Sequence, residues 1–201
     1  WIHNPADVER WTPGLIPLLQ SRKIKRVGVS NHSLKQVNRV NEILKPAGFS
    51  VSAVQNHYSL LYRSSEEAGI LDYCHQNNMT FFAYMVLEQG ALGGRYDSQH
   101  PMPAGSDRAE TYNNVLPQLE KLTAAMKEMG DKKNASVAQI AIAWAIAKGT
   151  LPIIGVTKVD HVTDAARAAE IQLGADEIVT LEELAKATGV DTRGAWEKPM
   201  I

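Results

Sequence analysis

The stretch "RVGVSNHSLKQV", residues 26–37, decides the fold class because it joins a buried strand directly to a capped helix. Its apolar run "VGV" predicts a strand covered on both faces. The segment "SLKQ" that follows has the spacing of a capping box, with the Ser33 hydroxyl at the N-cap and a glutamine three residues later. Because Ser33 caps the helix, Ser30 and Asn31 keep their hydrogen-bonding groups at the carboxyl end of the strand. They either complete a turn or bind a ligand.

The rest of the chain repeats the order of strand and helix. Further strands are predicted within residues 51–61, 79–84 and 151–155, after a first strand end at residues 3–5, and helices within residues 33–48, 68–77, 115–130, 136–149, 161–171 and 176–189. A long irregular stretch, residues 88–113, interrupts the alternation and is a candidate lid because it exceeds the usual loop length.

Buried strands that alternate with helices imply a parallel sheet with right-handed crossovers. Such a sheet belongs either to an open doubly wound fold or to a (β/α)8 barrel. No G-x-G-x-x-G fingerprint lies between a strand and its helix, and its absence favours the barrel. We therefore expect an α/β fold of the (β/α)8 TIM-barrel type, with about the last five βα units in one domain that covers residues 1–201. The chain starts without methionine at what resembles a strand end, so we expect the amino-terminal part to be missing.

The composition excludes several classes of protein. Of the 201 residues, 44% are hydrophobic and 21% are charged, as in an ordinary globular domain. A net charge of −1 gives no reason to expect nucleic acid or a membrane surface as partner, and no apolar run approaches the roughly 18 residues of a membrane span. The single Cys74, expected to be buried and inert, fits a reducing compartment such as the cytoplasm. The histidines have no metal-ligand spacing, so no metal site is predicted.

Polar residues follow every predicted strand. Because the carboxyl ends of parallel strands converge on one face, these residues are expected to surround a common ligand. A carboxamide, which both donates and accepts hydrogen bonds, would suit Ser30, Asn31 and Gln55, while Tyr84 offers a ring for stacking. The alternative for each residue is a purely structural role, such as a satisfied turn or a core aromatic with a hydrated hydroxyl.

A second subsite is predicted where the last strand meets its helix. Residues 157–160 resemble a capping box with Thr157 at the N-cap, which would place Lys158 in the first helical turn. The helix dipole disfavours a cation there, and a bound anion such as phosphate would reverse the sign of that interaction. The alternative is an ordinary solvated lysine.

A resemblance to known proteins covers the whole chain and is carried by "WIHNPADVERW", "RVGVSNHSL", "VQNHYSLLYR", "FFAYMVLEQGALGGRY", "LPIIGVTKVDHVTDA" and "ATGVDTRGAWEKPM". Taken together, these segments resemble the aldo/keto reductase family, and the last of them looks like the end of its bacterial members. The resemblance implies a (β/α)8 barrel that reduces small carbonyl substrates with NAD(P)H. It also implies that this chain is the carboxyl-terminal portion, which carries mainly the cofactor-binding half.

The resemblance assigns roles to individual residues. It implies that His3 is the active-site histidine, that Ser30, Asn31 and Gln55 hold the nicotinamide carboxamide, and that Tyr84 stacks on the nicotinamide. The remaining cofactor residues are Leu87, Gly90, Leu92 and Arg95 along the pyrophosphate, Gly155, Thr157 and Lys158 at the adenosine phosphate, and His161 and Asp164 toward the adenine.

Some positions depart from the family pattern. Met85-Val86 stands where members often have Ser-Pro, His161 where an arginine often recognises the 2′-phosphate, and Ala165 where an asparagine often meets adenine. The resemblance and Lys158 lead us to expect NADP as cofactor, and these departures leave NAD as the alternative. The family's catalytic Asp, Tyr and Lys lie on its first three strands, so the 201 residues alone are expected to be inactive. Two other readings of the protein are a nucleotide-sensing barrel without turnover and an inactive truncated fragment.

Overall fold

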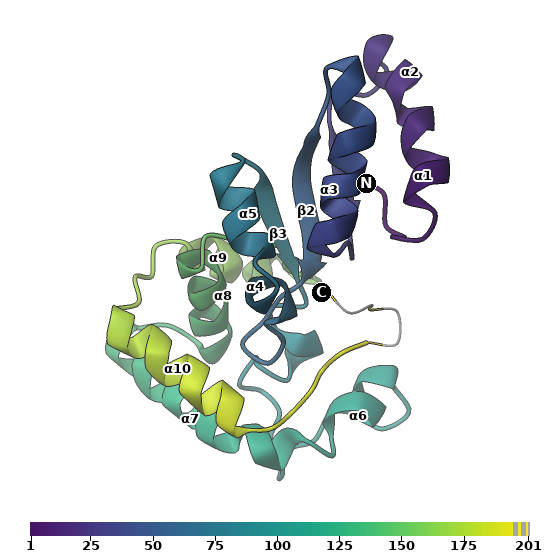
Figure 1. Ribbon diagram of the computed structural model, residues 1–201. Coiled ribbons are helices and arrows are strands. Elements are labelled where there is room, and N and C mark those ends of the chain that lie inside the picture. Colours follow the sequence, from purple (N-terminus) through teal and green to yellow (C-terminus); the bar gives the residue numbers. More distant parts are fainter. Residues whose placement is uncertain (195–196, 198–199, 201) are drawn as a thin grey trace.

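The computed structural model describes residues 1–194, 197 and 200 and is built on a parallel four-stranded sheet in the order β1-β2-β3-β4 (Figure 1). The strands are β1 (Val27–Ser30), β2 (Val51–His57), β3 (Thr80–Tyr84) and β4 (Leu151–Pro152). Ile2 extends the sheet beyond β1, because its backbone N–H donates to Gly28 at 2.9 Å and its carbonyl accepts from Ser30 at 2.7 Å. The parallel α/β sheet predicted from the sequence is therefore confirmed.

Helices connect and flank the strands. They are α1 (Val8–Trp11), α2 (Ile16–Gln20), α3 (Leu34–Leu44), α4 (Ser64–Glu67), α5 (Ile70–Gln76), α6 (Asp107–Tyr112), α7 (Leu116–Lys133), α8 (Val137–Ala147), α9 (Val159–Ala168) and α10 (Ala175–Ala187). Helix α3 packs on β2, α5 on β3 and α8 on β4, while α7 and α10 lie side by side (Figure 1). This order positions the loops after β1, β2 and β3 at one end of the sheet.

Helix α3 shows how the sequence sets an element. The Ser33 hydroxyl accepts from the Gln36 N–H at 3.4 Å, and the Gln36 side chain accepts from the Ser33 N–H at 2.8 Å, so the predicted capping box is present. Val37, Val40 and Leu44 fall on one face and are fully buried. The helix runs into the 3-10 turn Lys45–Ala47, and Gly48 follows with a φ of 81° that glycine adopts without strain.

The main core lies between the sheet and its helices. It combines strand residues such as Val29, Val54 and Phe81 with helix residues such as Ile140 and Trp144, all nearly inaccessible to solvent. Helix α8 is buried along most of its length, as its apolar composition predicts. Cys74 belongs to the same core, where burial raises the pKa of its thiol to about 12, as expected for an inert cysteine.

Several boundaries differ from the sequence prediction. The stretch 88–113 is not wholly irregular, since it contains the 3-10 turn Glu88–Gly90 (η3) and helix α6. Together with the start of α7, α6 closes a second, smaller core around Met102 and Tyr112. The last strand, predicted over residues 151–155, is reduced to Leu151–Pro152 because pairing with β3 stops there. Among the helices described, none has the length and hydropathy needed to cross a membrane.

Candidate functional site

The ends of β1, β2 and β3 bring together the three residues predicted to bind a carboxamide and the tyrosine predicted to stack beside it. The Gln55 amide donates to the Ser30 hydroxyl at 3.3 Å, and the Tyr84 hydroxyl donates to the Asn31 side-chain oxygen at 2.6 Å. Ser30 pairs with Gln55 in the strand register, so their proximity follows from the sheet itself. Asn31 Nδ2 reaches the backbone carbonyl of the exposed His3 at 3.4 Å, which places His3 beside this group.

A cleft of about 530 Å³ lies between the segment that follows β3 and the segment that follows β4. Seven of the predicted cofactor residues line it: Leu87, Gly90, Arg95, Gly155, Thr157, His161 and Asp164. Leu92 does not line it, because its side chain is fully buried in the main core. Lys158 is exposed and also lies outside the cleft lining.

Two guanidinium groups make one wall of the cleft cationic. Arg95 and Arg108 both lie over the Tyr96 ring, at 5.4 Å and 5.5 Å from its centroid, and Arg108 donates to the Tyr96 hydroxyl at 3.4 Å. Arginines held in this way suit phosphate oxygens, since their planar donors match phosphate geometry. The sequence prediction missed Arg108, because it lies in the stretch that was expected to be irregular.

The start of α9 differs from the prediction. Lys158, not Thr157, is the N-cap residue, with extended backbone angles and no side-chain cap, so the predicted capping box and the placement of Lys158 in the first turn are wrong. The Thr157 backbone N–H instead donates to the His161 ring nitrogen at 3.4 Å, and so His161 bridges the turn. His161 and Thr157 still line the end of the cleft at this helix terminus.

Four residues with side chains adopt left-handed backbone angles around the site. Asn31 follows β1 with a φ of 60°, and Met85, Glu88 and Gln89 follow β3 with φ values of 62°, 46° and 52°. Such angles are uncommon outside glycine, cost of order 1–3 kcal/mol each in strain and concentrate at binding sites. The turn after β3, between Tyr84 and the cleft, is therefore held in place by its surroundings.

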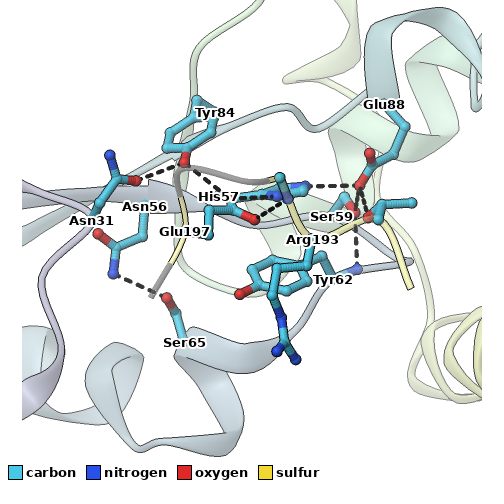
Figure 2. Close-up of polar contacts among 12 residues, drawn as sticks. Asn31, Asn56, His57, Ser59, Tyr62, Ser65, Tyr84, Glu88, Arg193 and Glu197 are labelled. Atoms are coloured by element: carbon cyan, nitrogen blue, oxygen red, sulfur yellow. Dashed lines mark hydrogen bonds and ion pairs between the residues drawn. The ribbon is translucent and has the colours of Figure 1, made fainter. Parts of the chain in front are cut away.

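A buried charge cluster around His57 helps to hold the turn after β3 in place. The Nδ1 atom of His57 lies 2.7 Å from Glu197 Oε1 and its Nε2 atom 2.9 Å from Glu88 Oε1, and all three side chains are fully buried (Figure 2). Burial alone would lower the pKa of His57, but the hydrogen bonds and negative charges of Glu197 and Glu88 outweigh it and raise the pKa to about 9. His57 is therefore an imidazolium at neutral pH.

Glu88 is held from several directions. Its Oε1 atom also accepts from the Ser59 hydroxyl and, at 3.0 Å, from the Thr192 hydroxyl, while Oε2 accepts from Tyr112 at 2.6 Å. These bonds fix the turn whose neighbours Leu87 and Gln89 line the cleft. The sequence prediction missed this cluster, since its members are up to 140 residues apart along the chain. The only local sign was a glutamate between apolar and glycine residues after β3.

Known proteins resemble this chain over most of its length. The model of the aldo/keto reductase family matches residues 6–186. The pyridoxal reductase of Arabidopsis thaliana chloroplasts is 34% identical over 173 residues, which cover 86% of this chain and 47% of that protein. A putative aryl-alcohol dehydrogenase of Schizosaccharomyces pombe is 27% identical over 182 residues, covering 89% and 51%.

Solved structures share the fold at lower identity. The glycerol dehydrogenase of Gluconobacter oxydans superimposes with a TM-score of 0.73 at 24% identity, over 91% of this chain and 56% of that one. A thermostable aldo-keto reductase superimposes with a TM-score of 0.70 at 22% identity, over 91% and 58%. The chain thus spans about half the length of the relatives it matches.

Proposed function

The chain belongs to the aldo/keto reductase family, and we propose that its protein reduces small aldehydes or ketones with NADPH, with these residues supplying mainly the cofactor-binding part of the reaction. The observation that carries the proposal is the continuity between two features. The strand-end group of Ser30, Asn31, Gln55 and Tyr84 adjoins the turn after β3, and that turn leads into the cleft that ends at α9.

The donor set fits a nicotinamide dinucleotide. Ser30, Asn31 and Gln55 would hold a carboxamide, since each side chain both donates and accepts, and the Tyr84 ring offers a stacking face. Arg95 would offset the charge of the pyrophosphate from the cleft wall. When bound, the dihydronicotinamide supplies a hydride to the carbonyl carbon. The residues of this chain orient it and shield it from water.

His3 is the family catalytic residue that the resemblance places among the 201 residues. We propose that it polarises the carbonyl oxygen of the substrate, since an imidazole N–H aimed at that oxygen stabilises the charge that develops there. The contact between the His3 backbone carbonyl and Asn31 Nδ2 supports this role, because it places residue 3 beside the proposed nicotinamide subsite.

A cytoplasmic location stays a prediction from the single cysteine.

We propose a modest preference for NADPH over NADH. The amino end of α9 has no side-chain cap and can offer N–H groups to an anion; Lys158 is its N-cap residue and His161 lies in its first turn. An imidazole and a lysine give less geometric specificity than a bidentate arginine. We expect a ratio of dissociation constants of about 10-fold, equivalent to roughly 1.4 kcal/mol, and a smaller ratio in Lys158→Ala.

The test is a fluorescence titration of NADPH into the full polypeptide that contains these residues. Gln55→Ala and Asn31→Gly should each weaken binding by about 5- to 150-fold, because a buried polar partner left unpaired costs roughly 1–3 kcal/mol. Glycine is chosen at position 31 because it keeps the positive φ without strain. Gln76→Ala, at the exposed end of α5, is the matched control.

Two results would count against the proposal. Unchanged affinity in both variants would return these residues to a purely structural role. Tight NADPH binding with no turnover of any test aldehyde or ketone would instead indicate a nucleotide sensor.

A further inference from the structure

Glu197, beyond α10 in the sequence, lies at the carboxyl ends of β2 and β3, where it contacts His57 and Tyr84. Among the described residues after α10, Thr192, Glu197 and Met200 are buried. The Gly194 N–H donates to Glu197 Oε2 at 2.7 Å, and the Asn56 amide donates to the Met200 sulfur at 3.6 Å. Glu197 therefore brings a carboxylate from the far end of the sequence to the proposed nicotinamide subsite.

Glu197 Oε1 is shared between His57 and Tyr84. The His57 Nδ1 atom lies at 2.7 Å and the Tyr84 hydroxyl at 3.0 Å from this oxygen (Figure 2). The same hydroxyl lies 2.6 Å from Asn31 Oδ1. A line of polar contacts thus runs from His57 through Glu197 and Tyr84 to Asn31.

The Tyr84 hydroxyl has one proton, whereas both Asn31 Oδ1 and Glu197 Oε1 are acceptors. A carboxylate is the stronger acceptor of the two, since charge-assisted hydrogen bonds are about twice as strong as neutral ones. When the Tyr84 hydroxyl donates its hydrogen bond to Glu197 Oε1, Asn31 Oδ1 is left to accept from the amide of a bound carboxamide. The position of Tyr84 is fixed by the same contact.

His57 makes this placement of a carboxylate tenable. A carboxylate buried without a partner is costly, and the His57 imidazolium supplies the opposite charge. On its other side His57 is held by Glu88, and its ring stacks on Tyr62 at 4.3 Å and on Tyr84 at 5.6 Å between centroids. His57 thus couples Glu197 to the turn after β3.

We propose that Glu197, held by His57, is a positioning residue that sets Tyr84 and releases Asn31 for the nicotinamide end of the cofactor. The inference rests on the proposed function, because it needs a nicotinamide at this subsite. The proposal gives Glu197 a part in cofactor binding, although the residues that line the cleft all fall between Met85 and Ala165 in the sequence.

The experiment compares two ligands in the full polypeptide. NADPH reaches both ends of the site, whereas 2′-phospho-ADP-ribose lacks the nicotinamide. Glu197→Gln should weaken NADPH binding about 10-fold, as expected for the loss of one charge-assisted hydrogen bond, and leave the affinity for 2′-phospho-ADP-ribose unchanged. Glu197→Asp, which keeps the charge but withdraws it by one methylene, should show the same selective loss and serves as the second test if Glu197→Gln does not fold.

Glu182→Gln is the matched control. Glu182 is a partly buried carboxylate that binds Trp144 and Lys148 away from the cleft, so its loss should leave both affinities unchanged. Unchanged NADPH affinity in the Glu197 variants, with a wild type that binds, would overturn the inference and leave the proposed function intact. Equal weakening of both ligands would also overturn it, in favour of a general structural role. A wild type that binds neither ligand would overturn the proposed function itself.

Discussion

Raising the pH should remove the charge that holds the His57 cluster together. His57 lies between Glu88 and Glu197, and its pKa is raised from 6.5 to about 9. The rings of Tyr62 and Tyr84 stack on the imidazole, and the Ser59 hydroxyl donates to Glu88. The raised pKa adds to the free energy of unfolding. This contribution is complete at pH values below the unfolded-state pKa of 6.5 and is lost as the pH rises through about 9. The slope is roughly 1.4 kcal/mol per pH unit over that window, or about 3 kcal/mol in all.

Two measurements check this prediction. Proton–carbon NMR of the protein labelled at histidine should show an imidazole resonance that stays protonated to about pH 9. The substitution His57→Gln should remove this resonance and so assign it to His57. Urea unfolding between pH 6 and pH 9.5 should show the matching fall in the free energy of unfolding. The reasoning would be refuted by a His57 imidazole that loses its proton at or below pH 6.5, or by a stability that stays flat across the window.

Two further predictions concern the scaffold and are checked by urea unfolding at neutral pH. Ser33→Ala removes the capping box of α3 and should lower the free energy of unfolding by about 1 kcal/mol; no change would mean that the helix start is held by other contacts. Gly130→Ala should destabilise by roughly 1–3 kcal/mol despite the better helix propensity of alanine, because the new Cβ would lie 2.4 Å from the Ala135 carbonyl oxygen. Gly14→Ala, whose Cβ would meet nothing within 4 Å, is its control, and equal effects of the two would contradict the steric argument.

The parts of the fold that local physics controls were predictable from the sequence. The strand that leads to Ser30 and the helix after Ser33 follow from a short apolar run and a capping box, and both begin within a residue of the expected positions. The meeting of Ser30, Asn31, Gln55 and Tyr84 was predictable too, because parallel strands align their carboxyl ends.

The failures arise where tertiary contacts override local patterns. At Thr157 the motif for a cap was present, but His161 occupies the backbone N–H and the helix starts one residue later. Leu92 sits in a loop of cleft residues, yet its side chain turns into the core. The His57 cluster could not be predicted, since nothing local relates Glu197 to a strand 140 residues earlier.

The most direct test of the central claim is a crystal structure of the full polypeptide with NADP⁺. The account predicts the nicotinamide carboxamide against Ser30, Asn31 and Gln55, its ring on Tyr84, and the adenosine phosphate at the start of α9. A dinucleotide bound with its nicotinamide away from Tyr84, or bound outside the cleft between the turn after β3 and α9, would contradict it.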